Sequence, residues 1–204
     1  MILIALFLRV WQLNSAPPGL WFDEAYNGMD ALWSVDTNSW PVFLVGNNGR
    51  EIFYHYLLII STSILGETPY SLRIVSVLVS IVTLPLLYRW ILTLFADNPD
   101  KYWLALISMT GLATSFWYLT MNRAAYRANL LPLFVIGVSY FFWLGWTYSK
   151  LRYYVLAGAL LGFSQYTYLS ARLLPLVFGL FLVLQTLRLK QMPSKTRNRL
   201  RGQW

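Results

Sequence analysis

Two acidic residues stand side by side at Asp23-Glu24, in a polar stretch that follows an apolar N-terminal segment. The chain is 57% hydrophobic and has eight acidic residues in all, so an adjacent pair needs a reason. One interpretation is structural: the carboxylates lie in a solvated loop and cap a helix that starts near Ala25. The other is chemical: a catalytic carboxylate is held near the headgroups of a membrane. The rest of the sequence has to decide between the two.

Arginine side chains form the second group that could do chemistry. Arg123 and Arg127 are four residues apart and would share one helix face if a helix starts there, and Tyr126 would lie near that face. With Arg73 and Arg172 they could bind a phosphate group, because a planar guanidinium donates two parallel hydrogen bonds to it. The alternative for each arginine is a structural one, in which the charged end reaches from an apolar segment to the headgroup level.

His55 is the only histidine of the chain. With Asp23, Glu24 or Glu51 it could help to hold a divalent cation through imidazole and carboxylate ligands. No spacing in the sequence requires a metal, and a single histidine beside tyrosines is more often packed or interfacial. A cation therefore stays an option, and no cofactor is required.

Tyrosines near the basic residues have two interpretations as well. Tyr168 precedes Arg172 by one helical turn, close to the end of an apolar run. Tyrosine at that depth normally belongs to the aromatic belt of a membrane protein. The same side chain, with Tyr126, could instead form a wall of a lipid or sugar pocket, and Glu51 and His55 could contact the substrate there.

The composition indicates a membrane protein. Charged residues make up 12% of the chain, against about a quarter in soluble domains, and aromatic residues make up 18%. The absence of cysteine excludes disulfides and thiolate metal sites. The net charge is +8, but the basic residues lie between apolar runs or in the tail, so we do not expect nucleic-acid binding.

Six predicted membrane spans must position these side chains, and we expect an all-α, multi-pass bundle over residues 1–189. The spans are 1–13, 72–95, 102–121, 129–148, 153–168 and 173–189. The first is short, and Arg9 interrupts it in a way that does not suit a signal peptide. We therefore expect the chain to begin inside its first helix, as a fragment or through a late start, or else to need a partner, with 190–204 as a basic cytoplasmic tail.

The orientation follows from the basic residues at the ends of the spans. The larger set, which includes Lys101, Arg152 and the tail, predicts the cytoplasmic side. The run Ile52–Leu65 has about 14 apolar residues, and runs of this length are more often interfacial than spanning, so we expect it to lie in the interface. If it spanned the membrane instead, the acid pair would face the cytoplasm. With the run in the interface, residues 14–71 form one long outer loop, with amphipathic pieces near 25–33 and 52–65. Loops of this length are usually functional.

Several segments, taken in sequence order, resemble membrane glycosyltransferases of family 39, the protein O-mannosyltransferase and aminoarabinose-transferase relatives with the GT-C fold. The matching segments are a short apolar helix ending in Arg9, then 18–25 (PGLWFDEA), 65–73 (LGETPYSLR), 122–132 (NRAAYRANLLP), 153–162 and 166–172 (YTYLSAR). The family usually has more spans than this chain and often an outer C-terminal region.

The resemblance implies a sugar donor of the polyprenyl-phosphate class and an acceptor hydroxyl on a protein, lipid or glycan, at the outer face of the cell membrane. It implies that Asp23 acts as base or binds the acceptor, and that Glu24 orients Asp23 or helps to hold a cation. A single displacement would invert the anomeric configuration, and the arginines would stabilise the leaving phosphate.

Two other classes of function stay open at this point. A transporter or lipid flippase would carry charges along its spans, but the five long runs have almost none away from their ends. Glycine and proline do interrupt these runs, as in transporters with broken helices. A non-catalytic scaffold subunit would keep its function after loss of the acid pair.

Overall fold

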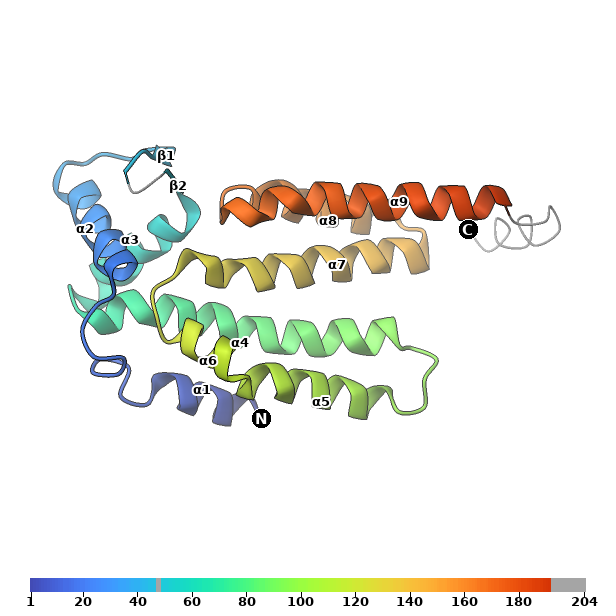
Figure 1. Cartoon of the computed structure of the whole chain (residues 1–204), viewed down its shortest axis with the longest axis horizontal. Helices are drawn as coiled ribbons and strands as arrows, with labels where there is room; N and C mark the ends of the chain where they lie inside the picture. The colour runs from blue at the N-terminus through green and yellow to red at the C-terminus, as the bar shows by residue number, and fades with distance from the viewer. Residues whose placement is uncertain (47–48, 192–204) are drawn as a thin grey trace.

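The computed structural model describes residues 1–46 and 49–191, and in this part of the chain it is a bundle of long helices with a smaller helical layer at one end (Figure 1). The predicted all-α membrane bundle is confirmed. The helices are α1 Ile2–Val10, α2 Phe22–Asp36, α3 Phe53–Leu65, α4 Pro69–Leu94, α5 Lys101–Thr114, α6 Phe116–Asn122, α7 Leu130–Tyr148, α8 Leu151–Ser164 and α9 Leu174–Gln191. Two short 3₁₀ helices, η1 Arg127–Asn129 and η2 Leu169–Leu173, precede α7 and α9. The strands β1 Phe43–Leu44 and β2 Arg50–Glu51 pair antiparallel.

Three segments of the described chain are long and apolar enough to cross a membrane: Pro69–Leu94, Arg127–Tyr148 and Leu169–Arg188. The predicted span 102–121 is instead two helices, α5 and α6, which pass the same test together and are bent by 58° at Ser115. Helices α1 and α8 are shorter, with 9 and 14 residues. The count of six spans, the side of the membrane and the tail beyond residue 191, which lies outside the described residues, therefore stay predictions.

Two arginines fasten α1 to the bundle. The bend at Ser115 ends the helical hydrogen bonding of α5, and the buried Arg9 donates from Nη1 to the carbonyl oxygen of Ala113 at 3.2 Å. Arg123, which follows α6, donates to four carbonyl oxygens within residues 8–16, at 2.8–3.3 Å. Carbonyl groups at a helix end lack hydrogen-bond donors within the helix, and Arg123 supplies the missing donors.

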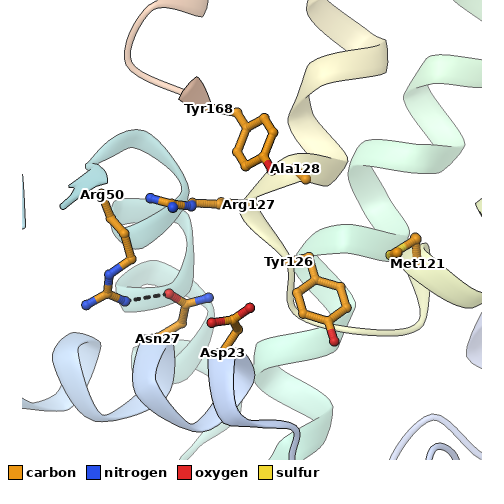
Figure 2. Close-up of a pocket in the computed structure, with 8 residues that line it drawn as sticks. All are labelled: Asp23, Asn27, Arg50, Met121, Tyr126, Arg127, Ala128 and Tyr168. Atoms are coloured by element: carbon orange, nitrogen blue, oxygen red, sulfur yellow. Dashed lines mark hydrogen bonds between the residues drawn. The ribbon is translucent and has the colours of Figure 1, made fainter. Parts of the chain in front are cut away.

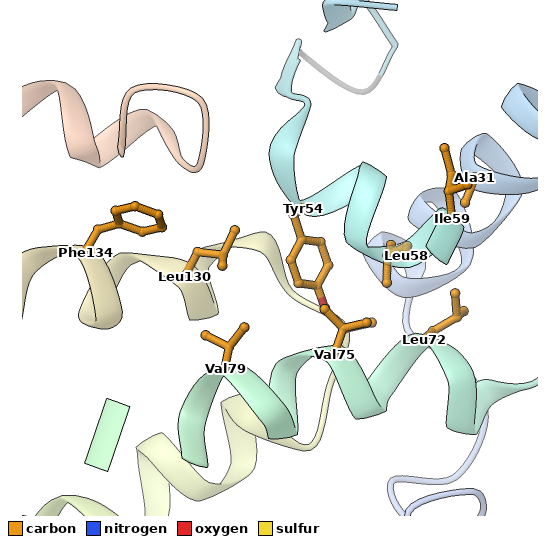
Figure 3. Packing of buried hydrophobic residues seen from close by; sticks show 10 residues of the cluster. Ala31, Tyr54, Leu58, Ile59, Leu72, Val75, Val79, Leu130 and Phe134 are labelled. Atoms are coloured by element: carbon orange, nitrogen blue, oxygen red, sulfur yellow. The ribbon is translucent and has the colours of Figure 1, made fainter. Parts of the chain in front are cut away.

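The smaller layer at one end of the bundle, which we call the end layer, consists of α2, β1, β2 and α3 (Figure 1). An apolar core packs α2 and α3 of this layer against the long helices (Figure 3). Its buried members are Ala31 of α2, Tyr54, Leu58 and Ile59 of α3, Leu72, Val75 and Val79 of α4, Ala125, and Leu130 and Phe134 of α7. Helix α2 approaches α4 closely at Gly28, where an added Cβ would lie 3.0 Å from Leu72 Cδ1. The end layer is therefore packed rigidly onto the spans and can hold side chains in fixed positions.

Candidate active site

A pocket of about 340 Å³ opens where the end layer meets two connections of the bundle, the one between α6 and α7 and the one between α8 and η2 (Figure 2). Pockets of this size accommodate small ligands. Helix α2 contributes Asp23 and Asn27, and β2 contributes Arg50. The lining is completed by Met121, Tyr126, Arg127, Ala128 and Tyr168.

Helix α2 separates the two members of the acid pair. It begins at Phe22, so Asp23 and Glu24 are in its first turn and point about 100° apart around the helix. Asp23 lines the pocket, together with Asn27 one turn later on the same face. Glu24 is 1% exposed and accepts a hydrogen bond from the backbone N–H of Trp21 at 3.0 Å. Glu24 thus caps α2, but it is buried instead of solvated, and the helix begins at Phe22 instead of near Ala25. Of the pair, only Asp23 lines the pocket and could take part in chemistry there.

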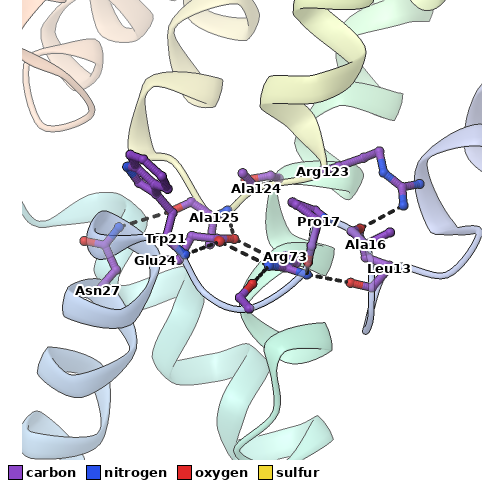
Figure 4. Close-up of polar contacts among 12 residues, drawn as sticks. Leu13, Ala16, Pro17, Trp21, Glu24, Asn27, Arg73, Arg123, Ala124 and Ala125 are labelled. Atoms are coloured by element: carbon purple, nitrogen blue, oxygen red, sulfur yellow. Dashed lines mark hydrogen bonds and ion pairs between the residues drawn. The ribbon is translucent and has the colours of Figure 1, made fainter.

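Arg73 of α4 is the ion-pair partner of Glu24, and both side chains are buried. Its Nε and Nη2 lie 3.0 and 3.2 Å from the two carboxylate oxygens (Figure 4). The guanidinium also donates hydrogen bonds to the carbonyl oxygens of Leu13, Pro17 and Gly19. The structure therefore places neither Arg73 nor Glu24 at the pocket. Arg123, which holds the end of α1, is also absent from the lining.

Glu51 brings together the two other arginines expected to bind phosphate. It is 7% exposed, and its carboxylate accepts from Arg127 Nη1 at 3.2 Å and from Arg172 Nη2 at 3.3 Å. The guanidinium of Arg127 also lies 5.7 Å from the ring centroid of Tyr168. Of these three side chains only Arg127 lines the pocket, and Glu51 and Arg172 lie behind it. The Arg127 guanidinium is the group of this cluster that could attract an anionic group in the pocket.

Arg50 and Asn27 belong to the pocket, although the sequence did not single them out. Arg50 is buried, forms an ion pair with Asp30, and donates from Nη1 to Asn27 Oδ1 at 2.8 Å. The positions 23, 27 and 30 recur at helical spacing, which would have placed all three side chains on one face of a helix that starts at Phe22. No comparable signal marks Arg50, because strands of two residues have no usable periodicity.

Tyr126 lies opposite the acidic first turn of α2 in the pocket. Burial raises the pKa of its phenol above the ordinary value, and the negative charges of Glu24 and Asp23 raise it further. Tyr126 therefore keeps its proton at neutral pH and can donate a hydrogen bond into the pocket. Tyr168 presents an aromatic ring to the pocket beside Arg127 (Figure 2).

His55 lies away from the pocket, in the interface between α2 and α3. It is 4% exposed, and its Nε2 lies 3.0 Å from Ser34 Oγ. Burial lowers the pKa of the imidazole, and the nearby Asp30 only partly opposes this. Within residues 1–46 and 49–191, no group of three His, Cys, Asp or Glu side chains could hold a metal ion. The structure thus does not gather His55 with the acid pair.

Comparison with known proteins gives one match. The protein-family model for dolichyl-phosphate-mannose-protein mannosyltransferase matches residues 50–196. No curated protein and no solved structure matches the chain. The matched segment starts at Arg50 and includes Glu51, Tyr126, Arg127 and Tyr168, whereas Asp23 and Asn27 precede it.

Proposed function

The chain belongs to the dolichyl-phosphate-mannose-protein mannosyltransferase family, and on this premise we propose that it transfers a sugar from a polyprenyl-phosphate donor to an acceptor hydroxyl. Membership in this family makes the chain a glycosyltransferase of the GT-C type. Sugar transfer is therefore favoured over the two other classes of function, a transporter and a non-catalytic scaffold. One observation carries the assignment of the site: Asp23 of α2 and Arg127 of the α6–α7 connection line the same pocket.

Asp23 is the proposed general base. The acceptor oxygen attacks the anomeric carbon of the donor sugar, and its proton passes to the Asp23 carboxylate as the new bond forms. The bond between the anomeric carbon and the phosphate oxygen breaks, and the phosphate leaves with the electron pair. Proton removal by a positioned carboxylate typically contributes about 10²–10⁴-fold to the rate. A single displacement of this kind inverts the anomeric configuration.

Arg127 is the proposed partner of the phosphate, assisted by Arg172. Charge accumulates on the phosphate oxygens as the bond breaks, and a guanidinium fixed next to them lowers the energy of the transition state. Arg127 and Arg172 share the single carboxylate of Glu51, so neither guanidinium has a carboxylate of its own there, and this suits the binding of a phosphodiester with a single negative charge. We no longer assign phosphate binding to Arg73 and Arg123, because their donors are engaged elsewhere.

We place the pocket on the outer face of the cell membrane. The end layer, the α6–α7 connection and the α8–η2 connection lie at one end of the bundle, and the connections after α4 and α7 lie at the other (Figure 1). Lys101 and Arg152 stand next to those opposite connections. The rule that basic residues remain in the cytoplasm then supports an extracytoplasmic pocket.

The test is sugar transfer by the full chain in nanodiscs, with polyprenyl-phosphate mannose as donor probe and a serine-containing peptide, a lipid and a glycan tried as acceptors. We expect a glycosylated product whose anomeric configuration, read by NMR, is opposite to that of the donor. Hydrolysis of the donor with water as acceptor would give the same inversion. A retained configuration, or no reaction with any acceptor or with water, would refute the proposal.

A further inference from the structure

The backbone of Ala125 is held by two side chains of α2 (Figure 4). Its N–H donates to Glu24 Oε1 at 2.9 Å, and its carbonyl oxygen accepts from Asn27 Nδ2 at 3.1 Å. Ala125 is fully buried, and Glu24 and Asn27 are 1% and 9% exposed. Both hydrogen-bonding groups of this residue are therefore engaged by one helix, in a place from which water is excluded.

The two side chains that hold Ala125 are themselves fixed. The Glu24 carboxylate is paired with Arg73 and accepts from the Trp21 backbone, so its rotamer is locked. Arg50 donates to Asn27 Oδ1, and this leaves the amide nitrogen of Asn27 to face the Ala125 carbonyl. Because their own rotamers are fixed, Glu24 and Asn27 can hold the Ala125 backbone in one geometry.

Ala125 is a direct link between the two sides of the pocket. It precedes Tyr126 and Arg127, which line one side. Glu24 follows Asp23 in α2, and Asn27 is one turn further along the same helix. The contacts to Ala125 are thus a short physical connection between the proposed base and the proposed phosphate ligand, which come from distant parts of the chain.

We propose that Glu24 and Asn27 are positioning residues, which set the placement of Tyr126 and Arg127 relative to Asp23 through the backbone of Ala125. This inference rests on the proposed function for its kinetic consequence, and on the hydrogen bonds alone for its structural one. Sugar transfer needs the base and the phosphate ligand on opposite sides of one reacting carbon. A displacement of about 1 Å in such a site can lower the rate by about 10²-fold.

Two variants remove the contacts separately. Asn27→Asp keeps an acceptor for Arg50 and loses the N–H group that reaches the Ala125 carbonyl. The double variant Glu24→Leu/Arg73→Met removes the acceptor for the Ala125 N–H without leaving an unpaired buried charge, which a single substitution would create. Ser61→Ala is the matched control, because it removes a buried hydrogen bond between α3 and Ser71 that does not involve Ala125.

The readout combines kinetics with a distance. The chain has no cysteine, so spin labels can be placed at Val35→Cys on α2 and Thr120→Cys on α6, both exposed. Pulsed EPR on the full chain in nanodiscs then reports the distribution of distances between α2 and the helix leading to Ala125. In parallel, kcat and the donor KM are measured with polyprenyl-phosphate mannose.

We expect each variant to shift or broaden the distance distribution and to lower kcat by about 10–100-fold, with a smaller change in the donor KM, while Ser61→Ala changes neither. An unchanged distribution in both variants would overturn the proposal, and so would a shifted distribution with an unchanged kcat. A wild-type chain that transfers no sugar would refute the proposed function, and the EPR result would still decide whether the contacts set the placement of Ala125.

Discussion

Asp23 and Glu24 are neighbours in the sequence, yet only Asp23 lines the pocket, whereas Glu24 is 1% exposed and ion-paired with Arg73. The two carboxylates therefore have separate consequences when they are neutralised. Glu24→Gln leaves a buried guanidinium without its counter-ion, and we expect it to lower the free energy of unfolding by about 3–5 kcal/mol. Thermal unfolding of the purified variants measures this, with Asp36→Asn, an exposed position of α2, as the control. Equal midpoints for Glu24→Gln and Asp36→Asn would contradict the assignment.

Two of the arginines also differ in role: Arg127 lines the pocket, whereas Arg123 holds the end of α1. Arg127→Ala should raise the donor KM about tenfold or more, because a hydrogen bond to a charged group contributes about 1.5–3 kcal/mol. Arg123→Ala should leave the donor KM nearly unchanged and destabilise α1, since Arg123 binds carbonyl groups at the end of that helix. Steady-state kinetics with varied donor separate the two. The reverse pattern would return Arg123 to the phosphate site.

Glu51 competes with the phosphate for Arg127 and Arg172 in this account. Glu51→Gln removes a negative charge beside the proposed phosphate position, so the donor KM should fall several-fold at low ionic strength and less at high salt. Glu67→Gln, in the connection between α3 and α4, is a control of the same chemistry away from the pocket. A donor KM that rises in Glu51→Gln would show that the carboxylate supports the arginines more than it opposes the phosphate.

We expect His55 to make the stability of the end layer sensitive to acid. Burial holds the pKa of the folded imidazole below its ordinary value near 6.5, so the unfolded state binds the extra proton first. The contribution to stability is complete above pH 6.5 and is lost as the pH falls towards the folded pKa. The protection factors of the α2 and α3 amides, which are exchange rates corrected for the intrinsic pH dependence, should therefore fall as the pH drops below about 6.5 in the wild type, more than in His55→Gln. Parallel pH profiles in the two proteins would exclude His55 as the cause.

The side of the membrane can be read from single cysteines. Thr37 is exposed in the end layer, and Ala96 is exposed in the connection between α4 and α5 at the opposite end. A membrane-impermeant maleimide added to intact cells should label Thr37→Cys and should reach Ala96→Cys only after permeabilisation. Labelling in the opposite order would place the pocket in the cytoplasm and remove the proposed outer-face reaction.

The fold class could be predicted from the sequence, because apolar runs of about 20 residues with few charges are typical of helices that cross a membrane. The break at Ser115 did not follow, since hydropathy reads α5 and α6 as one run. For the site, Asp23, Tyr126, Arg127 and Tyr168 were all expected, and the structure places them around one pocket.

The separate roles of the arginines could not be obtained from the sequence. Arg73 and Arg127 have the same residue type and the same predicted side of the membrane, and only tertiary contacts show that Arg73 is fully engaged by Glu24 and backbone carbonyls. Arg50 could not be assigned to the site from the sequence, because its partners Asn27 and Asp30 lie in a different element.

The central claim is that Asp23 removes the proton of the acceptor hydroxyl, and the kcat of Asp23→Asn at saturating donor tests it most directly. We expect kcat to fall by about 10²–10⁴-fold, with the donor KM and the unfolding midpoint close to those of the wild type. Asp36→Asn should retain the wild-type kcat. An Asp23→Asn variant that transfers sugar at the wild-type rate would contradict the account.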